Sequence, residues 1–252
     1  MPAAGKKHKQ TKPDYIQWVL VVGAVISITV LAGLFVKRYI LHPSVNVDPF
    51  PIKGIDVSGH NKVTDWQQVA DSGIEFVFIK ATEGASYTNP LFNKQYEGAR
   101  SAGLKVGCYH FFRKNRDGAA QARHFLAAIG KRTIDLPLVV DVEDWDNDRS
   151  VDDATTRQRL QDMVATLERH GHSVMIYTNG DGYKSYYKPL LKDHDLWLSS
   201  FNEPHKMKGY SHVIQQYSHW GTVEGIKGDV DMNIFVGSER EWNIWLDQVK
   251  HP

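Results

Sequence analysis

Eight short runs of apolar and β-branched residues recur along the chain, and their number and spacing constrain the fold more than any other feature. Continuous apolar runs of this length are typical of strands that are covered on both faces. The runs are Gly54–Val57, Phe76–Lys80, Val106–Phe112, Leu138–Val142, Val174–Thr178, Leu196–Ser200, Val213–Tyr217 and Val230–Phe235.

The intervals between the runs predict which strands are joined by helices. From Asp56 to Lys80 the interval is 24 residues, and from Asp141 to Thr178 it is 37. Apolar residues three and four apart fill the intervals between the first five runs, as in amphipathic helices. The last three runs lie only 16 and 15 residues apart. Once strand residues are subtracted, we expect these gaps to be too short for parallel crossovers. An irregular TIM-like (β/α)5β3 barrel over residues 54–252 is therefore predicted.

An uncharged apolar stretch precedes the predicted barrel. Residues Trp18 to Val36 carry no charge. As a helix they would span about 28 Å, close to the roughly 30 Å core of a bilayer. The stretch is longer than the apolar part of most signal peptides, so we expect an uncleaved transmembrane helix over 18–36 that contacts membrane lipid.

Flanking charge predicts the orientation of this helix. Four lysines precede it and only two basic residues follow it, which places the N-terminus in the cytoplasm by the positive-inside rule. These residues are Lys6, Lys7, Lys9, Lys12, Lys37 and Arg38. The expected organisation is a cytoplasmic basic tail at 1–17, the span, a proline-containing tether at 37–53 and the barrel. We expect a single-pass protein of the bacterial inner (cytoplasmic) membrane, with its barrel in the periplasm or outside.

Composition excludes several classes of function. The net charge is +1, from 30 basic and 29 acidic residues, so a globally basic nucleic-acid binder is not expected. The single cysteine, Cys108, rules out a disulfide framework and a thiolate zinc site within one chain. None of the 12 histidines has the spacing of metal ligands. The sequence therefore predicts neither a metal site nor a cofactor.

Four acidic residues lie at or near predicted strand ends, where β/α barrels carry their chemistry. They are Asp56, Asp141, Glu143 and Asp231. Asp141 and Glu143 are two residues apart on one strand and so share a face. Mutual repulsion and burial should raise the pKa of at least one of them, and a carboxyl protonated near neutral pH can protonate a glycosidic oxygen. A salt-bridged structural pair is the alternative, with Lys80 as its basic partner.

Aromatic and polar side chains gather at the same predicted rim. Aromatic faces can stack on sugars and amides can bond hydroxyls, although single aromatic residues at such positions are often core. The candidate substrate-binding residues are Glu83, Tyr109, His110, Phe111, Tyr177, Trp197, Gln216 and Tyr217. Their clustering beside the four acids predicts a sugar-binding cleft.

Six motifs, in this order, give the chain a family resemblance: GIDVSGHN, FVFIKATEG, GCYHFF, DVED, IYTNG and VDMN. The chain resembles glycoside hydrolase family 25, the muramidase-type lysozymes. The resemblance implies a (β/α)5β3 barrel that cleaves the β-1,4 bond between N-acetylmuramic acid and N-acetylglucosamine in peptidoglycan glycan strands. It places Glu143 as general acid/base, Asp141 as the second acid of D-x-E, and Asp56 and Asp231 as the remaining active-site aspartates.

The chain departs from the family pattern at Gln215, where tryptophan is frequent, and at Trp197–Phe201, where W-x-A-x-Y is frequent. These departures concern sugar contacts rather than the acids. We favour a substrate-assisted mechanism in which the 2-acetamido oxygen attacks the anomeric carbon. The alternative function is a catalytically inactive glycan-binding or scaffolding barrel at the cell envelope. A chitin-cleaving barrel is less favoured because the D-x-x-D-x-D-x-E pattern is absent.

Overall fold

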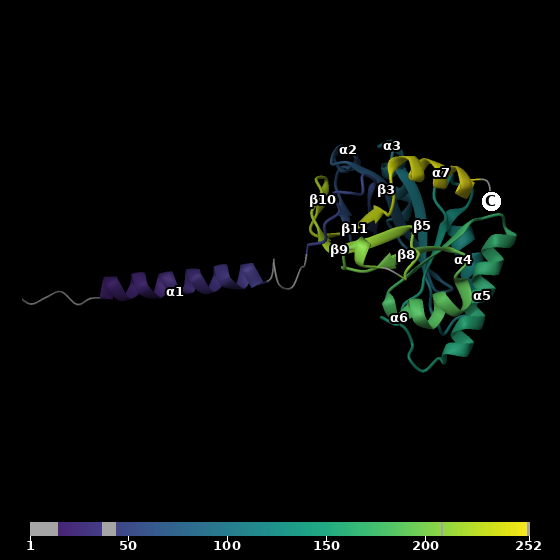
Figure 1. Cartoon of the computed structure of the whole chain (residues 1–252), viewed down its shortest axis with the longest axis horizontal. Helices are drawn as coiled ribbons and strands as arrows, with labels where there is room; N and C mark the ends of the chain where they lie inside the picture. The colour runs from purple at the N-terminus through teal and green to yellow at the C-terminus, as the bar shows by residue number, and fades with distance from the viewer. Residues whose placement is uncertain (1–14, 37–43, 208, 251–252) are drawn as a thin grey trace, which may run out of the picture. The chain divides into compact units, whose positions relative to one another are not determined.

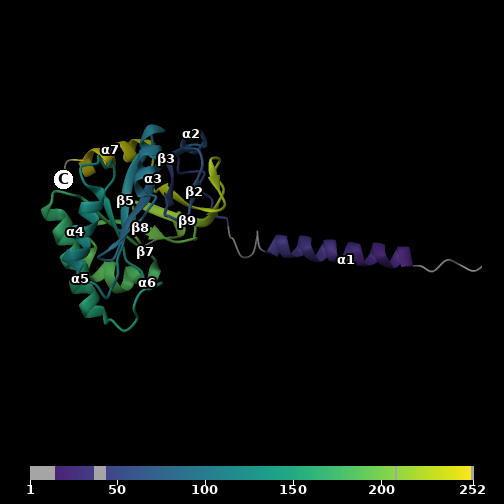
Figure 2. The ribbon, with the colours of Figure 1, turned by 180° about the vertical axis from the view of Figure 1, so that it is seen from behind.

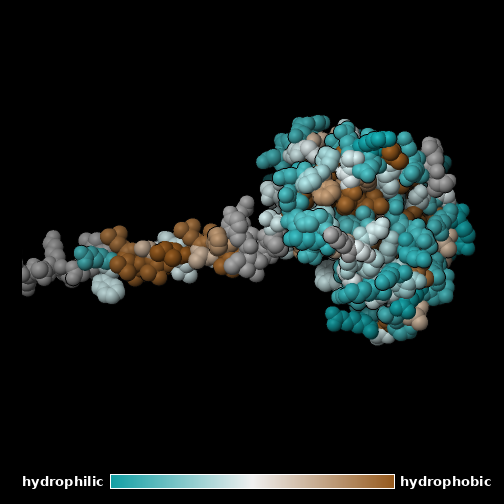
Figure 3. All heavy atoms as spheres, in the orientation of Figure 1, coloured by the Kyte–Doolittle hydropathy of each residue, from teal (hydrophilic) through white to brown (hydrophobic). Residues whose placement is uncertain are grey.

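The computed structural model describes residues 15–36, 44–207 and 209–250, and the chain divides into two units, Met1–Ser44 and Val45–Pro252. In the first unit, α1 (Tyr15–Phe35) is long and apolar enough to cross a membrane (brown in Figure 3). Its two hydroxyl residues bond within the helix, Ser27 Oγ to the Gly23 carbonyl and Thr29 Oγ1 to the Val25 carbonyl. The flanking basic residues at 6–12 and 37–38 lie outside the described residues.

The second unit is built on a closed barrel of eight strands (Figure 1). Each predicted run forms one strand. They are β1 (Lys53–Val57), β3 (Ile74–Glu83), β5 (Lys105–Phe111), β6 (Leu138–Asp141), β7 (Val174–Thr178), β8 (Asp195–Ser199), β9 (Ile214–Gly221) and β11 (Val230–Phe235). Neighbours pair in this order and β11 returns to β1. All pairs are parallel except β9–β11 and β11–β1, which are antiparallel. The predicted (β/α)5β3 barrel is confirmed.

Five helical crossovers join the first six strands. They are α2 (Trp66–Asp71), α3 (Phe92–Ser101), α4 (Gly118–Ile129), α5 (Asp153–Arg169), and α6 (Gly180–Gly182) continued by the π-helix η2 (Tyr183–Leu191). Helices α4 and α5 lie side by side outside the barrel (Figures 1 and 2). Gly118 permits their close approach, because a Cβ there would lie 1.7 Å from the Arg159 carbonyl oxygen. Short strands β2 (Lys62–Val63) and β10 (Ile226–Lys227) pair with each other, and β4 (Tyr87–Thr88) pairs with β3.

One expectation about the last strands is wrong, and one helix after them was not predicted. Strand β9 lies parallel to β8, although the interval was expected to be too short for such a crossover. Residues 200–213 make the connection with only the short 3-10 helix η3 (Pro204–Lys206), so a parallel link without an α-helix is sufficient here. The sequence reading also missed the C-terminal helix α7 (Glu239–Lys250).

Side chains alternate between the outer and inner face of each strand, so they pack in two separate hydrophobic cores. Outward-facing side chains such as Val77 and Val140 pack in the core cluster that includes the helix residues Phe125 and Leu160. Inward-facing aromatic residues such as Phe78 belong to the second cluster.

Helix α7 closes the end of the barrel at which β3 begins. The Trp242 ring lies 5.3 Å from that of Phe76 and 5.2 Å from that of Phe235. Trp245 Nε1 donates to Asp195 Oδ2 at 2.7 Å. With this end filled, the interior can accept polar side chains only toward the carboxyl ends of the parallel strands.

Candidate active site

A cavity of about 800 Å³ opens at the carboxyl ends of the parallel strands. Ten of the twelve predicted site residues line it, although they come from all eight barrel strands and one loop. They are Asp56, Glu83, Tyr109, Phe111, Asp141, Glu143, Tyr177, Trp197, Gln216 and Asp231. We call this cavity the cleft.

His110 does not line the cleft, so the structure does not bring this predicted substrate-binding residue together with the others. It alternates with Tyr109 and Phe111 on β5, so its ring faces the outer helices while theirs face inward. The buried ring bonds to Thr82 Oγ1 at 2.7 Å and to Gln121 Oε1 at 3.1 Å. Burial lowers the pKa of His110 to about 3, so the imidazole is neutral.

Tyr217 is the second predicted substrate-binding residue that lies outside the cleft. Its neighbour Gln216 faces into the barrel, and Tyr217 lies where the β9–β11 register shifts, between the paired residues Gln216 and Ser218. It does not line the cleft and is only half-buried. The motifs did not exclude His110 or Tyr217, because each stands in the same short run as a neighbour that lines the cleft.

Asp141 and Glu143 form the acidic pair at the end of β6. Asp141 is 7% exposed, and among the described residues its Oδ1 has no hydrogen-bond partner. Burial and then the charge of Glu143 raise the pKa of Asp141 well above its usual value. Glu143 is more accessible, and its Oε1 accepts a bond from Asn179 Nδ2 at 3.1 Å. Burial also raises the pKa of Glu143, although the charge of His219 and the hydrogen bond from Asn179 act in the opposite direction.

Asp56 accepts the last hydrogen bonds of a network whose donors all point toward it. Its Oδ2 accepts bonds from Gln216 Nε2 and Asn233 Nδ2, both at 2.9 Å. Gln216 Oε1 in turn accepts from Tyr177 at 2.8 Å, and Asn233 Oδ1 accepts from the Trp197 indole at 2.8 Å. These bonds fix both amides with their NH₂ groups toward Asp56. Burial and the nearby Asp231 nevertheless raise the pKa of Asp56.

Asp231 has a basic partner that the sequence reading missed. His219 Nδ1 lies 2.8 Å from Asp231 Oδ1, and both residues line the cleft. The hydrogen bond to Asp231 raises the pKa of His219, so the imidazolium is favoured. The Phe201 ring packs edge-on against the imidazole at 4.8 Å. His219 lines the cleft three residues after Gln216, because the register of β9 shifts between them, so strand alternation does not identify it. Nothing local to it in sequence identifies its acidic partner.

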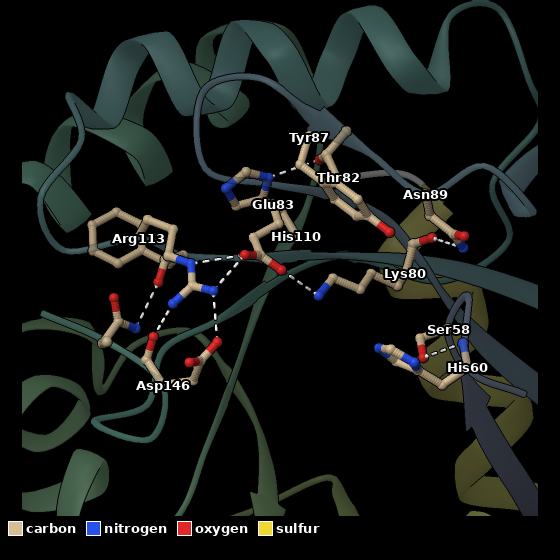
Figure 4. Close-up of polar contacts among 12 residues, drawn as sticks. Ser58, His60, Lys80, Thr82, Glu83, Tyr87, Asn89, His110, Arg113 and Asp146 are labelled. Atoms are coloured by element: carbon tan, nitrogen blue, oxygen red, sulfur yellow. Dashed lines mark hydrogen bonds and ion pairs between the residues drawn. The ribbon is translucent and has the colours of Figure 1, made fainter.

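Glu83 lies in the cleft wall as an ion-paired residue. Lys80 Nζ is 2.6 Å from Glu83 Oε2, and Arg113 Nε donates to Glu83 Oε1 at 2.8 Å (Figure 4). Burial alone would raise the pKa of Glu83, but the bonds from Lys80 and Arg113 lower it below its usual value. Glu83 is therefore ionised at neutral pH and is not a proton donor.

The loop after β6 is fastened to the end of β5. Arg113 Nη2 donates to Asp146 Oδ2 at 2.7 Å (Figure 4), and Asn147 Nδ2 donates at 2.9 Å to the carbonyls of Phe112 and Glu143. Asp146 adopts a left-handed conformation with φ of 55°, which is uncommon outside glycine. The loop presents Trp145, 71% exposed, at the cleft. These bonds hold the backbone beside Glu143 in place.

Within the described part of the chain, no group of three or more His, Cys, Asp and Glu side chains is arranged to hold a metal ion. The chemistry that this geometry supports is proton transfer between carboxyl groups of raised pKa and a polar ligand, in a cleft with aromatic walls.

Comparisons with known proteins agree with this geometry. The model of the family "Glycosyl hydrolases family 25" matches residues 55–226. The autolytic lysozyme of Clostridium acetobutylicum is 35% identical over 184 residues, which cover 73% of this chain and 56% of that protein. Lysozyme M1 of Streptomyces globisporus is 32% identical over 205 residues, 76% of this chain and 70% of that protein.

A solved structure shows the same architecture. A family 25 glycosyl hydrolase from Bacillus anthracis superposes with a TM-score of 0.74 at 30% identity, covering 81% of this chain and 96% of that one. Since the family model spans most of the barrel and a third of the residues are shared with curated relatives, this chain belongs to glycosyl hydrolases family 25.

Proposed function

We propose that this protein is a peptidoglycan hydrolase that cleaves the β-1,4 bond between N-acetylmuramic acid and N-acetylglucosamine. The relatives described above are named lysozymes, and the cleft holds the four predicted acids together with aromatic walls. The proposed catalytic residues are Glu143, Asp141, Asp56 and Asp231. The Clostridium relative is nearly twice as long as the part that matches, so its name alone does not assign the activity.

One observation carries the proposal: the buried Asp141 Oδ1 lacks a hydrogen-bond donor among the described residues. Buried polar atoms normally have a partner, and an exception calls for a ligand or a catalytic explanation. The N–H of a 2-acetamido group is such a donor. Its bond would favour the anionic form of Asp141 and leave the proton of the acidic pair on the more accessible Glu143.

The proposed reaction proceeds in two steps. Glu143 donates its proton to the glycosidic oxygen while the acetamido oxygen attacks the anomeric carbon and the glycosidic bond breaks. Asp141 orients the acetamide N–H and stabilises the positive charge that spreads over the ring formed. Glu143 then accepts a proton from the water that opens this ring. Gln216 and Asn233 hold Asp56, and His219 holds Asp231. These bonds fix the positions of the two carboxyl groups that contribute to the negative potential of the site.

Among the predicted sugar contacts, Tyr109, Phe111 and Tyr177 are proposed to line the substrate path, with Trp145 added from its exposed position. Trp197 is 2% exposed and stacks on Phe78 at 4.5 Å. It forms the floor of the cleft, so we assign it a supporting role rather than an open stacking platform.

Glu143→Gln should remove catalysis while leaving the fold intact. The amide keeps the shape of the side chain but cannot transfer the proton, and general acid–base catalysis is worth about 10²–10⁴-fold. We expect kcat on purified peptidoglycan to fall at least about 100-fold, with a Tm at pH 7 no lower than that of the wild type. Exposed Glu75→Gln is the matched control. Near-normal activity of Glu143→Gln would exclude this role, and absence of activity in the wild type would favour the inactive glycan-binding barrel.

Asp141→Asn should stabilise the protein at neutral pH and reduce its activity. The folded pKa of Asp141 lies above its unfolded value of about 3.9. The folded state therefore holds a proton that the unfolded state releases, and wild-type stability falls as pH rises through that window. A buried unsatisfied group costs about 1–3 kcal/mol, so we expect the Tm at pH 7 to rise by roughly 2–10 °C, with a smaller difference at pH 4.

The control for this stability effect is Asp144→Asn. Burial opposes ionisation of Asp144, but its bond to Lys114 makes its pKa lower than usual. Neutralising this side chain should lower the Tm at pH 7, whereas Asp141→Asn should raise it. A Tm of Asp141→Asn at or below that of the wild type at pH 7 would show that burial of the Asp141 charge is not a cost to the fold.

The substrate-assisted route requires the N-acetyl group on the sugar that supplies the anomeric carbon. De-N-acetylated glycan should be cleaved at least about 100-fold more slowly, because the internal nucleophile is missing, while its binding weakens only modestly. Single-turnover rates and Kd values measured side by side test this. Early proton NMR spectra should show the β anomer as the first product. Equal rates on both glycans, or a first-formed α anomer, would support direct attack by water instead.

We further propose that residues 18–36 anchor the protein in the bacterial inner membrane as a single span. In this arrangement 1–17 is a cytoplasmic tail, 37–53 a tether and 54–252 the hydrolase in the periplasm or outside. The apolar surface of α1 and the internally bonded hydroxyls of Ser27 and Thr29 support this proposal, since a span must satisfy its own polar groups.

Protease protection tests the orientation. Protease added outside spheroplasts should remove the barrel and leave a small membrane-bound fragment, because the four lysines before the span keep the N-terminus inside. A cytoplasmic marker protein must stay intact in the same sample. Full protection of the barrel until the membrane is lysed would reverse the proposed orientation.

A further inference from the structure

A second hollow adjoins the cleft and has no role in the reaction described above. Its volume is about 590 Å³, within the range of small-molecule sites. Glu83 and Asp146 line both spaces, so the Glu83–Arg113–Asp146 bridge forms the ridge between them (Figure 4). We call this space the side hollow. A ligand held in the cleft near this ridge could extend a substituent into it.

The acidic groups of the side hollow already have partners. Asp144 is paired with Lys114, and Asp146 with Arg113. Asp148 accepts bonds from the backbone N–H of Ser150 at 2.9 Å and from its hydroxyl at 2.6 Å. Asp144 and Asp146 are thus paired with cations, and Asp148 is held by neutral donors.

Two guanidinium groups of the side hollow are less engaged, although the charge of Arg149 contributes to lowering the pKa of Asp144. Arg116 and Arg149 are exposed in its wall, and neither forms an ion pair within the described part of the chain. Each guanidinium offers five N–H donors in a planar fork that suits carboxylates. The unmet hydrogen-bonding capacity of the side hollow therefore favours an anionic ligand with planar carboxylate groups.

From this juxtaposition we propose that the side hollow binds the carboxylate-bearing peptide attached to the muramyl sugar, with Arg116 and Arg149 as its anion contacts. The inference rests on the proposed function, because a muramyl unit in the cleft is what delivers the peptide. The lactyl ether of muramic acid carries a short peptide with free carboxylates, and this substituent projects away from the glycosidic bond. The enzyme then prefers glycan whose peptides are intact over bare glycan.

Three substrates of matched chain length test this proposal with the full chain in detergent. One glycan carries intact peptides, one carries peptides with amidated carboxylates, and one has had its peptides removed by an amidase. For the wild type we expect kcat/KM on the intact substrate to exceed that on the other two about tenfold, mainly through KM, because charge-assisted bonds are lost.

The variant is the double change Arg116→Gln and Arg149→Gln. It should reduce the preference to about twofold or less, while continued cleavage of bare glycan shows that the catalytic centre is assembled. The matched control is Arg123→Gln with Arg240→Gln, two exposed arginines outside both cavities, which removes the same net charge. We expect it to retain the wild-type preference.

The outcomes separate the two proposals. Wild-type cleavage of all three glycans at equal rates, or a preference that survives in the Arg116/Arg149 variant, overturns the peptide site and leaves the muramidase function standing. An equal loss of preference in the control pair would attribute it to general charge and also overturn the site. Failure of the wild type to cleave any of the three contradicts the proposed function itself.

Discussion

Placing carboxyl groups at the open end of an apolar barrel is the constraint on which the rest of this structure depends. Asp56 is buried on β1 and is held by amides from β9 and β11, the two strands whose antiparallel pairing closes the barrel. The same bonds that complete the polar site therefore connect the closing strands. Removing charge from water is costly, and the raised pKa values of Asp56 and Asp141 show that this cost is only partly offset.

The two ends of the barrel have different roles. Aromatic rings fill the interior below the site, and α7 covers them with Trp242 and Trp245. Because α7 closes this end, a ligand can enter only from the end that holds the acids. The low polarity of the floor, including Trp197 and Phe78, strengthens every electrostatic interaction above it. Stability and chemistry thus use opposite ends of one strand set.

The loop after β6 links the cleft to its surroundings. Its left-handed Asp146 is stabilised by Arg113, and its Asn147 bonds the backbone at Glu143. Strained backbone persists only where neighbouring contacts hold it. Here those contacts come from the end of β5 and from Glu83, so three segments distant in sequence jointly fix the position of the proposed acid. The same bridge divides the cleft from the side hollow.

Sequence alone determined the eight strands, the five helical crossovers and the four acids, because strand periodicity and crossover length are local properties of the chain. It also placed Asp141 and Glu143 on one face. Only the tertiary structure separated Tyr109 from His110 and Gln216 from Tyr217, since the face that a strand turns inward depends on the closed barrel. The partnerships of His219 with Asp231 and of Arg113 with Glu83 and Asp146 likewise needed the fold, because each joins residues whose sequence separation carries no local signal.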